Sequence, residues 1–197
     1  MIAFIGLGNV GDSYTTTKHN AGFWVVNELA RRMNLAFKPG KGDFVYAQKK
    51  RGDLLLAKPT TGMNVSGLAV RAIKDQWSLA LEDIHVIVDD VDLPLGSLRI
   101  RPHGGDGSHR GMESVIYQLG DDRFPRLRIG IKTSEITRPA EKFVLKPFLK
   151  EDQLLAEDMV QRTADAAETI LRQGLQTAMN KYNRTQHQQL LANEENS

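Results

Sequence analysis

Short apolar runs with a strand-like pattern alternate with amphipathic helical segments along almost the whole chain, and this alternation constrains the fold more than any other feature. The segments expected as strands are 2–7, 44–48, 54–58, 85–88, 98–101 and 127–131. The segments expected as helices are 21–33, 65–77, 109–119 and, with a break at Gly174, 150 to about 183. The sequence therefore predicts one α/β domain over residues 1–183, built on a twisted mixed β-sheet flanked by helices.

The absence of several sequence features excludes whole classes of structure and chemistry. It contains no cysteine, which excludes disulfide scaffolds, thiolate nucleophiles and cysteine-bound metals. No apolar run approaches the roughly 18 residues that a membrane span needs, and the first residues carry no signal-peptide pattern. We therefore expect a cytoplasmic protein that does not contact membranes. The tail 184–197, rich in Gln, Asn and Glu, has too few apolar residues to pack and is expected to fray.

The charges nearly cancel over the whole chain but are unevenly distributed along it. The net charge is +2. Residues 96–150 hold eleven Lys and Arg against six Asp and Glu, whereas residues 151–197 hold four against eight. A basic middle beside an acidic end suggests one positive face that attracts a polyanion by counterion release. Charge spread over a solvated surface would give the same counts.

A glycine motif after the first expected strand resembles a dinucleotide site. Gly6, Gly8 and Gly11 match the Gly-x-Gly-x-x-Gly fingerprint. That fingerprint needs a helix to start at the glycines, so that the helix N-terminus meets the pyrophosphate. Here the glycines are followed by the loop-like segment 12–17, and the helix starts only near Ala21. We therefore expect no nucleotide cofactor.

Polar side chains suited to acid–base chemistry stand at the ends of the expected elements. His19 comes just before a helix, Asn9 lies in the glycine loop, and Asn64 lies between a strand and a helix, where it could also be a helix cap. The acid cluster 89–92 follows the strand that ends at Val88, at the edge where α/β folds bind ligands. Its carboxylates could orient a histidine base, bind a divalent cation or lie in a solvated turn.

The glycine-rich segment 104–111 is a candidate anion site. A glycine-rich loop that leads into a helix presents backbone N–H groups to an anion or an oxyanion. The basic residues that flank it are Arg99, Arg101, Arg126, Arg128 and Lys132. No serine stands in a nucleophile-elbow pattern and no cysteine is present, so water activated by His19 is the simplest hydrolytic mechanism. From the residues alone we expect an anion site beside a His, Asp and Asn cluster.

Five ordered blocks of the sequence closely resemble bacterial-type peptidyl-tRNA hydrolase. They are Gly-Leu-Gly-Asn-x-Gly at 6–11, Thr-Lys-His-Asn-Ala-Gly at 17–22, Pro-Thr-Thr-x-Met-Asn-x-Ser-Gly at 59–67, Asp-Asp-x-Asp-Leu-Pro-x-Gly at 89–96 and Arg-Leu-Arg-Ile-Gly-Ile at 126–131. The resemblance covers nearly the whole chain. It implies a monomeric α/β enzyme that uses no metal or cofactor. Its reaction would be hydrolysis of the ester between a peptide and the 3′-ribose of tRNA.

The resemblance also implies roles for individual residues. His19 would activate water and Asp89 would keep it basic and oriented, while Asn9 would help to distinguish a blocked peptidyl amine from a free aminoacyl one. The positions that would contact the peptide and the tRNA acceptor end are Tyr14, Gly62, Met63, Asn64 and Arg110. Arg101 and Arg128 would clamp the 5′-phosphate of tRNA, and Arg101 stands where the family usually has lysine.

Two departures from the family pattern bear on activity, and two alternatives stay open. Gly62 stands where an aromatic residue is common, and Arg110 replaces an asparagine that usually holds water or peptide. Arg110 could donate to an oxyanion, contact RNA or signal altered activity. One alternative is an RNA-binding relative of the same fold that has lost catalysis. The other is a metal-dependent phosphoesterase, for which no second histidine or carboxylate block is expected to complete a coordination shell.

Overall fold

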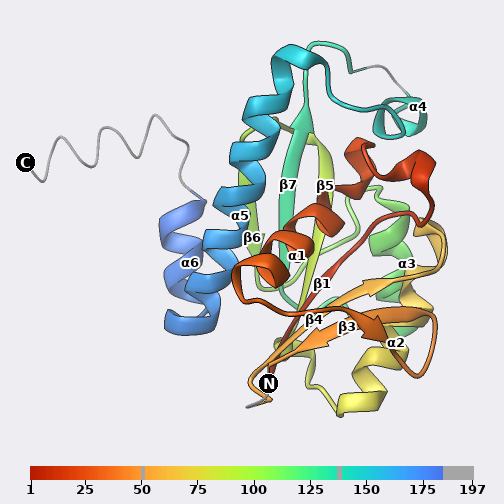
Figure 1. Ribbon diagram of the computed structural model, residues 1–197, viewed down its shortest axis with the longest axis vertical. Coiled ribbons are helices and arrows are strands. Elements are labelled where there is room, and N and C mark those ends of the chain that lie inside the picture. The colour runs from red at the N-terminus through yellow and green to blue at the C-terminus, as the bar shows by residue number, and fades with distance from the viewer. Residues whose placement is uncertain (50–51, 137–138, 184–197) are drawn as a thin grey trace, which may run out of the picture.

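The computed structural model describes residues 1–49, 52–136 and 139–183. They form a seven-stranded sheet in the order β2-β3-β4-β1-β5-β7-β6, with helices on both faces (Figure 1). The prediction of one α/β domain around a mixed sheet is confirmed. The predicted tail lies outside the described residues. None of the described helices combines the length and apolarity that a bilayer crossing demands.

Four strands of this sheet are parallel, and the chain leaves all four on the same side of the sheet, at their carboxyl ends. The strands are β1 (Ile2–Gly6), β2 (Lys38–Pro39), β3 (Phe44–Gln48), β4 (Leu54–Pro59), β5 (Ile84–Pro94), β6 (Leu98–Arg101) and β7 (Arg126–Lys132). The α-helices are α1 (Ala21–Arg32), α2 (Ser66–Trp77), α3 (Arg110–Leu119), α4 (Glu141–Val144), α5 (Gln153–Gln173) and α6 (Leu175–Tyr182). The 3₁₀ helices are η1 (Asp12–Tyr14), η2 (Lys18–Asn20), η3 (Met63–Val65), η4 (Leu81–Asp83) and η5 (Lys150–Asp152). Strands β1, β4, β5 and β7 run parallel, so their carboxyl ends lie together.

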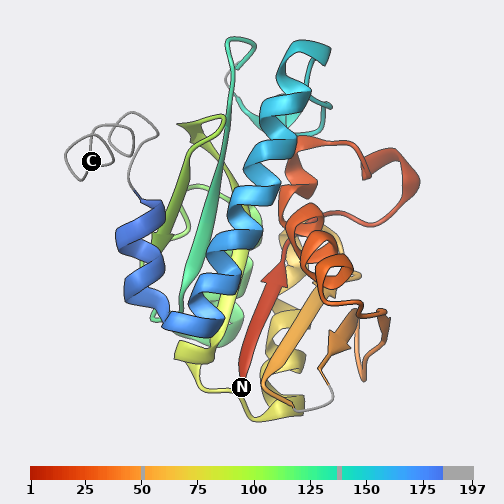
Figure 2. The same cartoon turned by 60° about the vertical axis from the view of Figure 1, so that its left-hand side comes forward.

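Two apolar cores hold the sheet, one on each face. Successive strand residues point to opposite faces. In β1, Phe4 therefore packs with residues of α1, α5 and α6, whereas Ala3 and Ile5 pack with residues of α2 and α3. Figures 1 and 2 show α1, α5 and α6 on one side of the sheet and α2 and α3 on the other. Both faces of the sheet are therefore covered by packed side chains.

The glycine motif after β1 does not open a helix. The chain passes through η1 and η2 before α1 starts at Ala21, so the dinucleotide fingerprint lacks its helix, as expected. Gly22 lies where α1 crosses the sheet, and a Cβ atom there would overlap the carbonyl of Ile87. This close approach brings η2, which carries His19, into contact with β5.

Strand β5 is longer than its apolar pattern predicts. The pattern predicts an end at Val88, whereas β5 continues through the acid cluster to Pro94 because this segment pairs with β7. Asp89 and Asp90 are buried in it, and both carboxylates have partners that offset the cost of burial. The sequence pattern also misses β2 and α4, which have only two and four residues.

A side chain closes the outer edge of the sheet. Among the strands of the described residues, β6 is the last and pairs only with β7. The side-chain amide of Asn183, which follows α6, accepts from the N–H of Ile100 at 2.7 Å and donates to its carbonyl at 3.0 Å. The backbone in the middle of the edge strand is thus satisfied without another strand.

A buried histidine makes the stability of the fold depend on pH. His85 lies in β5, is 3% exposed and packs against the ring of Phe4. Burial lowers the pKa of His85 from 6.5 to about 4. Between these two pH values the unfolded chain binds a proton that the folded chain does not. We therefore expect the free energy of unfolding to fall by up to about 3 kcal/mol on acidification through this window.

Denaturant titrations between pH 4 and 7 measure this effect directly. The variant His85→Gln cannot take up the proton and should lose most of the pH dependence in this window. The variant His103→Ala, which removes an exposed histidine, serves as the control and should keep it. An unchanged pH dependence in His85→Gln would assign the effect to another group.

Candidate active site

The residues expected to carry the chemistry meet at the carboxyl edge of the parallel strands. Asn9 follows β1, Asn64 follows β4 and Asp89 lies in β5. His19 lies in η2, immediately before α1. Because parallel strands end at the same edge, loops that are far apart in the sequence come together there.

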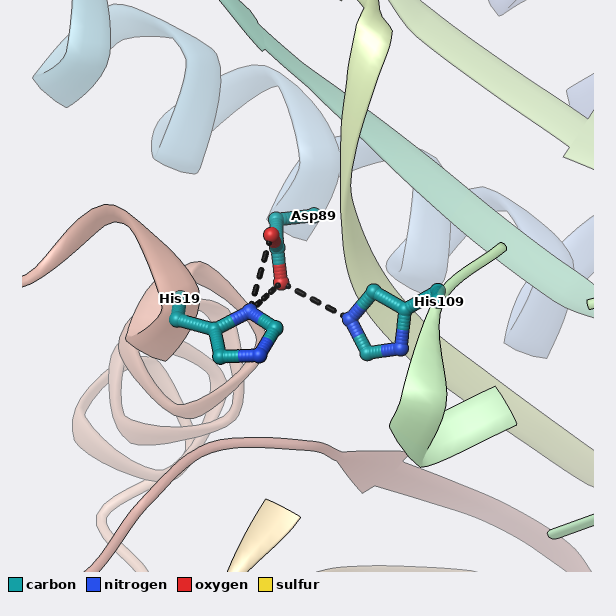
Figure 3. Close-up of side chains that lie close together, drawn as sticks. All are labelled: His19, Asp89 and His109. Carbon is teal, nitrogen blue, oxygen red and sulfur yellow. Dashed lines mark hydrogen bonds and ion pairs between the residues drawn. The ribbon is translucent and has the colours of Figure 1, made fainter. Parts of the chain in front are cut away.

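His19 and His109 lie on either side of the Asp89 carboxylate (Figure 3). His19 Nδ1 is 2.9 Å from Asp89 Oδ1 and 3.0 Å from Oδ2, and His109 Nε2 is 3.0 Å from Oδ1. The side chain of Asp89 is 1% exposed, that of His109 8% and that of His19 14%. His19 is therefore the member of this row that a ligand reaches most easily.

Hydrogen bonds determine which nitrogen of each ring carries the proton. His109 Nδ1 accepts from the backbone N–H of Met112 at 3.2 Å, so Nε2 carries the proton and donates to Asp89. Neutral His19 donates its Nδ1–H to the same carboxylate. Its Nε2 is then unprotonated, which is the state that a general base requires.

The surroundings of His19 and Asp89 shift the pKa of both groups. Burial of the His19 ring disfavours its charged form, but the charge of Asp89 and the hydrogen bond to it outweigh this and raise the pKa of His19 above its ordinary value. Burial also disfavours the charged form of Asp89, yet the two histidines hold the pKa of this carboxyl well below its usual range. Asp89 is therefore ionised at neutral pH and accepts from both rings.

The same three side chains are a candidate metal centre by composition. They offer one donor atom each, and these atoms lie within 4.8 Å of one another. His109 is a second histidine beside the acid cluster, so the expectation that none would be placed there is wrong. The facing atoms are already joined by hydrogen bonds, and the N–H of His109 points at Asp89 instead of a lone pair. The arrangement fits a hydrogen-bonded row better than a set of metal ligands.

Asn9 is fixed by hydrogen bonds on both its backbone and its side chain. The side chain of Asn20 accepts from the Asn9 N–H at 2.7 Å and donates to its carbonyl at 2.9 Å. Asn9 Oδ1 accepts from the N–H of Met63 at 2.9 Å, which ties the loop after β1 to η3. The Nδ2 group of Asn9 is left as the side-chain donor for a ligand.

Two adjoining cavities border His19. The first has a volume of about 260 Å³, and its lining includes Asp90, Gly107 and Arg128. The second has a volume of about 270 Å³, and its lining includes Asn9, Met63 and Asn64. The residues that line both are His19, Arg110, Glu141 and Val144. Together the two cavities form one cleft with His19 near its middle, which we call the catalytic cleft.

The structure brings together most, but not all, of the predicted site residues. Those that line the catalytic cleft are Asn9, His19, Met63, Asn64, Asp89, Arg110 and Arg128. Those that do not line it are Tyr14, Gly62 and Arg101. Tyr14 ends η1, Gly62 precedes η3, and Arg101 is an exposed residue at the end of the edge strand.

Four arginines lie on one face of strands β6 and β7. Arg99 is opposite Arg128 and Arg101 is opposite Arg126, and opposite residues point to the same face. Arg126 is nevertheless 1% exposed, and its guanidinium donates to backbone carbonyls, among them that of Gly104. Burial lowers the pKa of Arg126 to about 10. Arg126 therefore flanks the glycine-rich loop, as expected, and its guanidinium is used to hold the backbone of that loop.

Arg128 is the arginine of this face that reaches the catalytic cleft. Its Nε lies 2.9 Å from Asp90 Oδ2, and its side chain is 23% exposed. Gly107 has a φ of +62°, and a Cβ atom there would overlap the guanidinium. Glycine at this left-handed position therefore lets the loop close against Arg128.

Arg110, which departs from the family pattern, makes an ion pair at the cleft. It is the first residue of α3, and its Nη2 lies 3.5 Å from Glu141 Oε1, at the start of α4. The two side chains are 68% and 59% exposed. An exposed ion pair of this kind contributes about 1 kcal/mol at most. The pair can therefore open, which would leave Arg110 available to a ligand.

His109 is a site residue that is not among those predicted from the sequence. The helical pattern places it at the start of a helix, whereas it is the N-cap of α3, outside the helix. Its ring accepts from the first turn of α3 and donates to Asp89. The signal in the sequence was its place between a glycine-rich loop and a helix, which resembles the place of His19 before α1.

The fold and this row of side chains define an α/β protein with a carboxylate-bound histidine at the carboxyl edge of its sheet. The family model described as peptidyl-tRNA hydrolase matches residues 3–190. A peptidyl-tRNA hydrolase of Chloroflexus aurantiacus is 43% identical over 190 residues, which cover 93% of this chain and 99% of that one. One of Geobacillus kaustophilus is 40% identical over 185 residues, covering 93% and 100%. The chain belongs to the peptidyl-tRNA hydrolase family.

A solved structure extends the similarity to three dimensions. The crystal structure of peptidyl-tRNA hydrolase from Acinetobacter baumannii matches with a TM-score of 0.86 at 29% sequence identity. The match covers 93% of this chain and 94% of that one. The resemblance seen in the five sequence blocks is therefore confirmed over nearly the whole fold.

Proposed function

We propose that this chain hydrolyses the ester bond between a peptide, or an N-blocked aminoacyl group, and the 3′-ribose of tRNA, and so releases free tRNA. The observation that carries this proposal is the row formed by accessible His19 and buried Asp89 in the catalytic cleft of a peptidyl-tRNA hydrolase family member. A histidine held in this way can activate water directly, so no nucleophilic serine or cysteine is needed.

His19 acts as the general base and then as the general acid. Its Nε2 takes a proton from water as the water oxygen attacks the ester carbonyl, while Nδ1–H stays bonded to Asp89, whose charge stabilises the imidazolium. When the tetrahedral intermediate collapses, the bond to the ribose oxygen breaks and the imidazolium returns the proton to that oxygen. His109 donates to the same carboxylate and keeps Asp89 in position.

The Asn9 side of the cleft receives the acyl group in this proposal. Asn9 presents Nδ2 to the acyl group and helps to distinguish a blocked amine from a free one. A neutral amide has a carbonyl that can accept from this N–H group, whereas a charged amine has only donors. Met63 and Asn64 line the same cavity. Tyr14 and Gly62 contact the 3′-terminal nucleotide or peptide from loops outside the cavity.

The arginine side of the cleft receives the tRNA. We assign Arg101 and Arg128 to the 5′-phosphate, because they lie on the same face of the sheet and phosphate is bound strongly by guanidinium groups. Arg110 contacts the substrate once its pair with Glu141 opens. These groups all come from one chain, so the proposed reaction needs no second subunit, and we propose a monomer that acts in the cytoplasm without metal or cofactor. Sedimentation of the purified protein tests the monomer.

Turnover of N-blocked and free aminoacyl-tRNA by the purified protein tests the proposed function. Release of tRNA from the blocked form, with little from the free form, is the expected result, and a chelator should leave the rate unchanged. Tight binding of tRNA without release of the acyl group would instead support the alternative of an RNA-binding relative that has lost catalysis.

Removing the charge of Arg101 tests the tRNA clamp. The variant Arg101→Gln should raise KM and reduce the slope of log affinity against log salt by about 1, because one phosphate contact is lost. The remote exposed arginine variant Arg172→Gln, in α5, is the control. Arg128→Gln is less suitable because it would leave the buried carboxylate of Asp90 without its ion pair. An unchanged salt dependence in Arg101→Gln would remove this residue from the clamp.

A further inference from the structure

A surface groove continues the catalytic cleft beyond Asn64. It has a volume of about 430 Å³ and is lined by η3 and α2 on one side and by α3 on the other. It shares Asn64 and Arg110 with the cavity that contains His19. The remaining lining residues are Val65, Leu68, Glu113, Ser114, Tyr117 and Gln118. The groove is therefore continuous with the proposed site of the reaction.

Three large hydrophobic side chains in this groove are exposed to solvent. Tyr117 is 81% exposed, Leu68 51% and Val65 40%. In the part of the chain that the structure describes, Tyr117 is the most exposed large hydrophobic residue. Single exposed hydrophobic residues are common, but a group of them beside a cleft is typical of a binding surface.

The two helices that carry these side chains are closely packed. The N–H of Gly67 donates to Ser114 Oγ at 3.0 Å, and a Cβ atom at Gly67 would overlap the Ser114 carbonyl. Leu68 and Tyr117 are therefore held by helices in direct contact, not by a loop. A preformed groove loses less conformational entropy when it binds a ligand.

The two ends of the extended cleft differ in chemistry, and this difference orients the substrate. At one end, the lining includes Arg128, whose strand neighbours add further arginines. At the other end, the uncharged amides of Asn9 and Asn64 lead to the groove, where the charges of Arg110 and Glu113 are opposite in sign and the exposed hydrophobic side chains lie. A polyanionic tRNA favours the first end. The acyl group lies on the other side of the ester carbonyl and so extends toward the groove.

We propose that the groove formed by Val65, Leu68 and Tyr117 binds the part of the peptide that precedes the esterified residue, and that it favours apolar or aromatic side chains there. This inference rests on the proposed hydrolysis of peptidyl-tRNA. Each extended residue adds about 3.4 Å to the acyl group. The groove therefore contributes to the binding of longer peptides and not to that of a single blocked residue.

A comparison of long and short substrates on the same tRNA tests this proposal. The long substrate carries a tetrapeptide with leucine and phenylalanine before the esterified glycine, and the short one carries N-acetylglycine. In the double variant Leu68→Ser, Tyr117→Ser we expect the ratio of kcat/KM for the long over the short substrate to fall by about 3- to 10-fold, through a higher KM. Replacing leucine and phenylalanine in the peptide by serine should lower the ratio similarly in the unmodified protein.

The variant Leu154→Ser is the matched control, because Leu154 is 75% exposed but lies in α5, outside the groove. It should leave the ratio unchanged. A ratio that stays constant in the double variant overturns the proposal. An equal loss for both substrates also overturns it, because the groove would then act on the tRNA, for instance by stacking a base on Tyr117.

Failure of the proposed function would be seen separately, as an absence of turnover of either substrate by the unmodified protein. In that case the groove is tested by binding alone. Analogues that join the same long and short acyl groups to tRNA through an amide would be compared for affinity. Tighter binding of the long analogue, lost in the double variant, supports the groove, and equal binding of both analogues overturns it.

Discussion

Replacing His19 by alanine is expected to lower kcat for N-blocked aminoacyl-tRNA by about 10²- to 10⁴-fold, which is the usual contribution of a general base. The affinity for tRNA should change little, because the arginines that we assign to the tRNA lie elsewhere. Single-turnover kinetics and a separate binding titration distinguish the two effects. The loss should appear in the rate of the chemical step.

The variant His19→Asn separates the loss of the base from the loss of a hydrogen bond to Asp89. An asparagine amide can still donate to Asp89, so it tests whether filling the space beside the carboxylate restores the rate without a base. Both variants should remain folded, which thermal unfolding would show. A rate close to that of the unmodified protein in either variant would mean that another group activates the water.

Replacing Asp89 by asparagine is expected to lower kcat by as much as about 10⁴-fold, the loss seen when the orienting carboxylate of a serine-protease triad becomes an amide. An asparagine at this position can donate its N–H to His19 Nδ1. The proton of the ring would then move to Nε2, the atom that must accept a proton from water. Stopped-flow or quench measurements of acyl release would determine the loss.

The pH profile gives a second measure of the same interaction. In the unmodified protein the pKa of His19 is raised above its ordinary value, so kcat/KM, which reports groups of the free enzyme, should be constant above that pKa and fall about tenfold per pH unit below it. Asp89→Asn removes the charge that favours the imidazolium, while burial still disfavours it. The acid limb should therefore move to lower pH as the maximum rate falls.

The variant Asp90→Asn is the control for Asp89, because it changes the next carboxylate in the same strand. Asp90 pairs with Arg128 and not with His19. Its replacement should leave the acid limb of the profile in place. An acid limb that moves in Asp90→Asn but not in Asp89→Asn would transfer the orienting role to Asp90.

Local patterns in the sequence were sufficient to predict the α/β fold. The apolar runs of β1 and β4 and the hairpin of β3 with β4 are visible in the sequence because their period and turns are local. The strand order is not local, because β1 lies between β4 and β5 as a result of long-range packing. The continuation of β5 beyond Val88 also depends on partners for its acids that come from other elements.

Side-chain positions in the site also depend on long-range packing that local sequence patterns do not contain. His19, Asn9 and Asp89 could be proposed because each stands at the end of a predicted element. The place of His109 beside Asp89 depends on how α3 packs with α2 and η3 over the sheet, which no local pattern contains. Arg126 and Arg128 share a face of β7, as their spacing predicts, but the spacing does not show that a loop covers the first of them.

The hydrogen bonds of Asn183 to Ile100 also bear on how the protein behaves at high concentration. Exposed edge strands are the places where folded proteins join into larger aggregates by extending one another's sheets. On β6, which has four residues, the side chain of Asn183 takes both backbone groups that an incoming strand would need at Ile100. Asn183 thus protects this edge of the sheet from self-association, and a chain cut before Asn183 would leave the backbone groups of Ile100 open to another strand while its catalytic cleft remained complete.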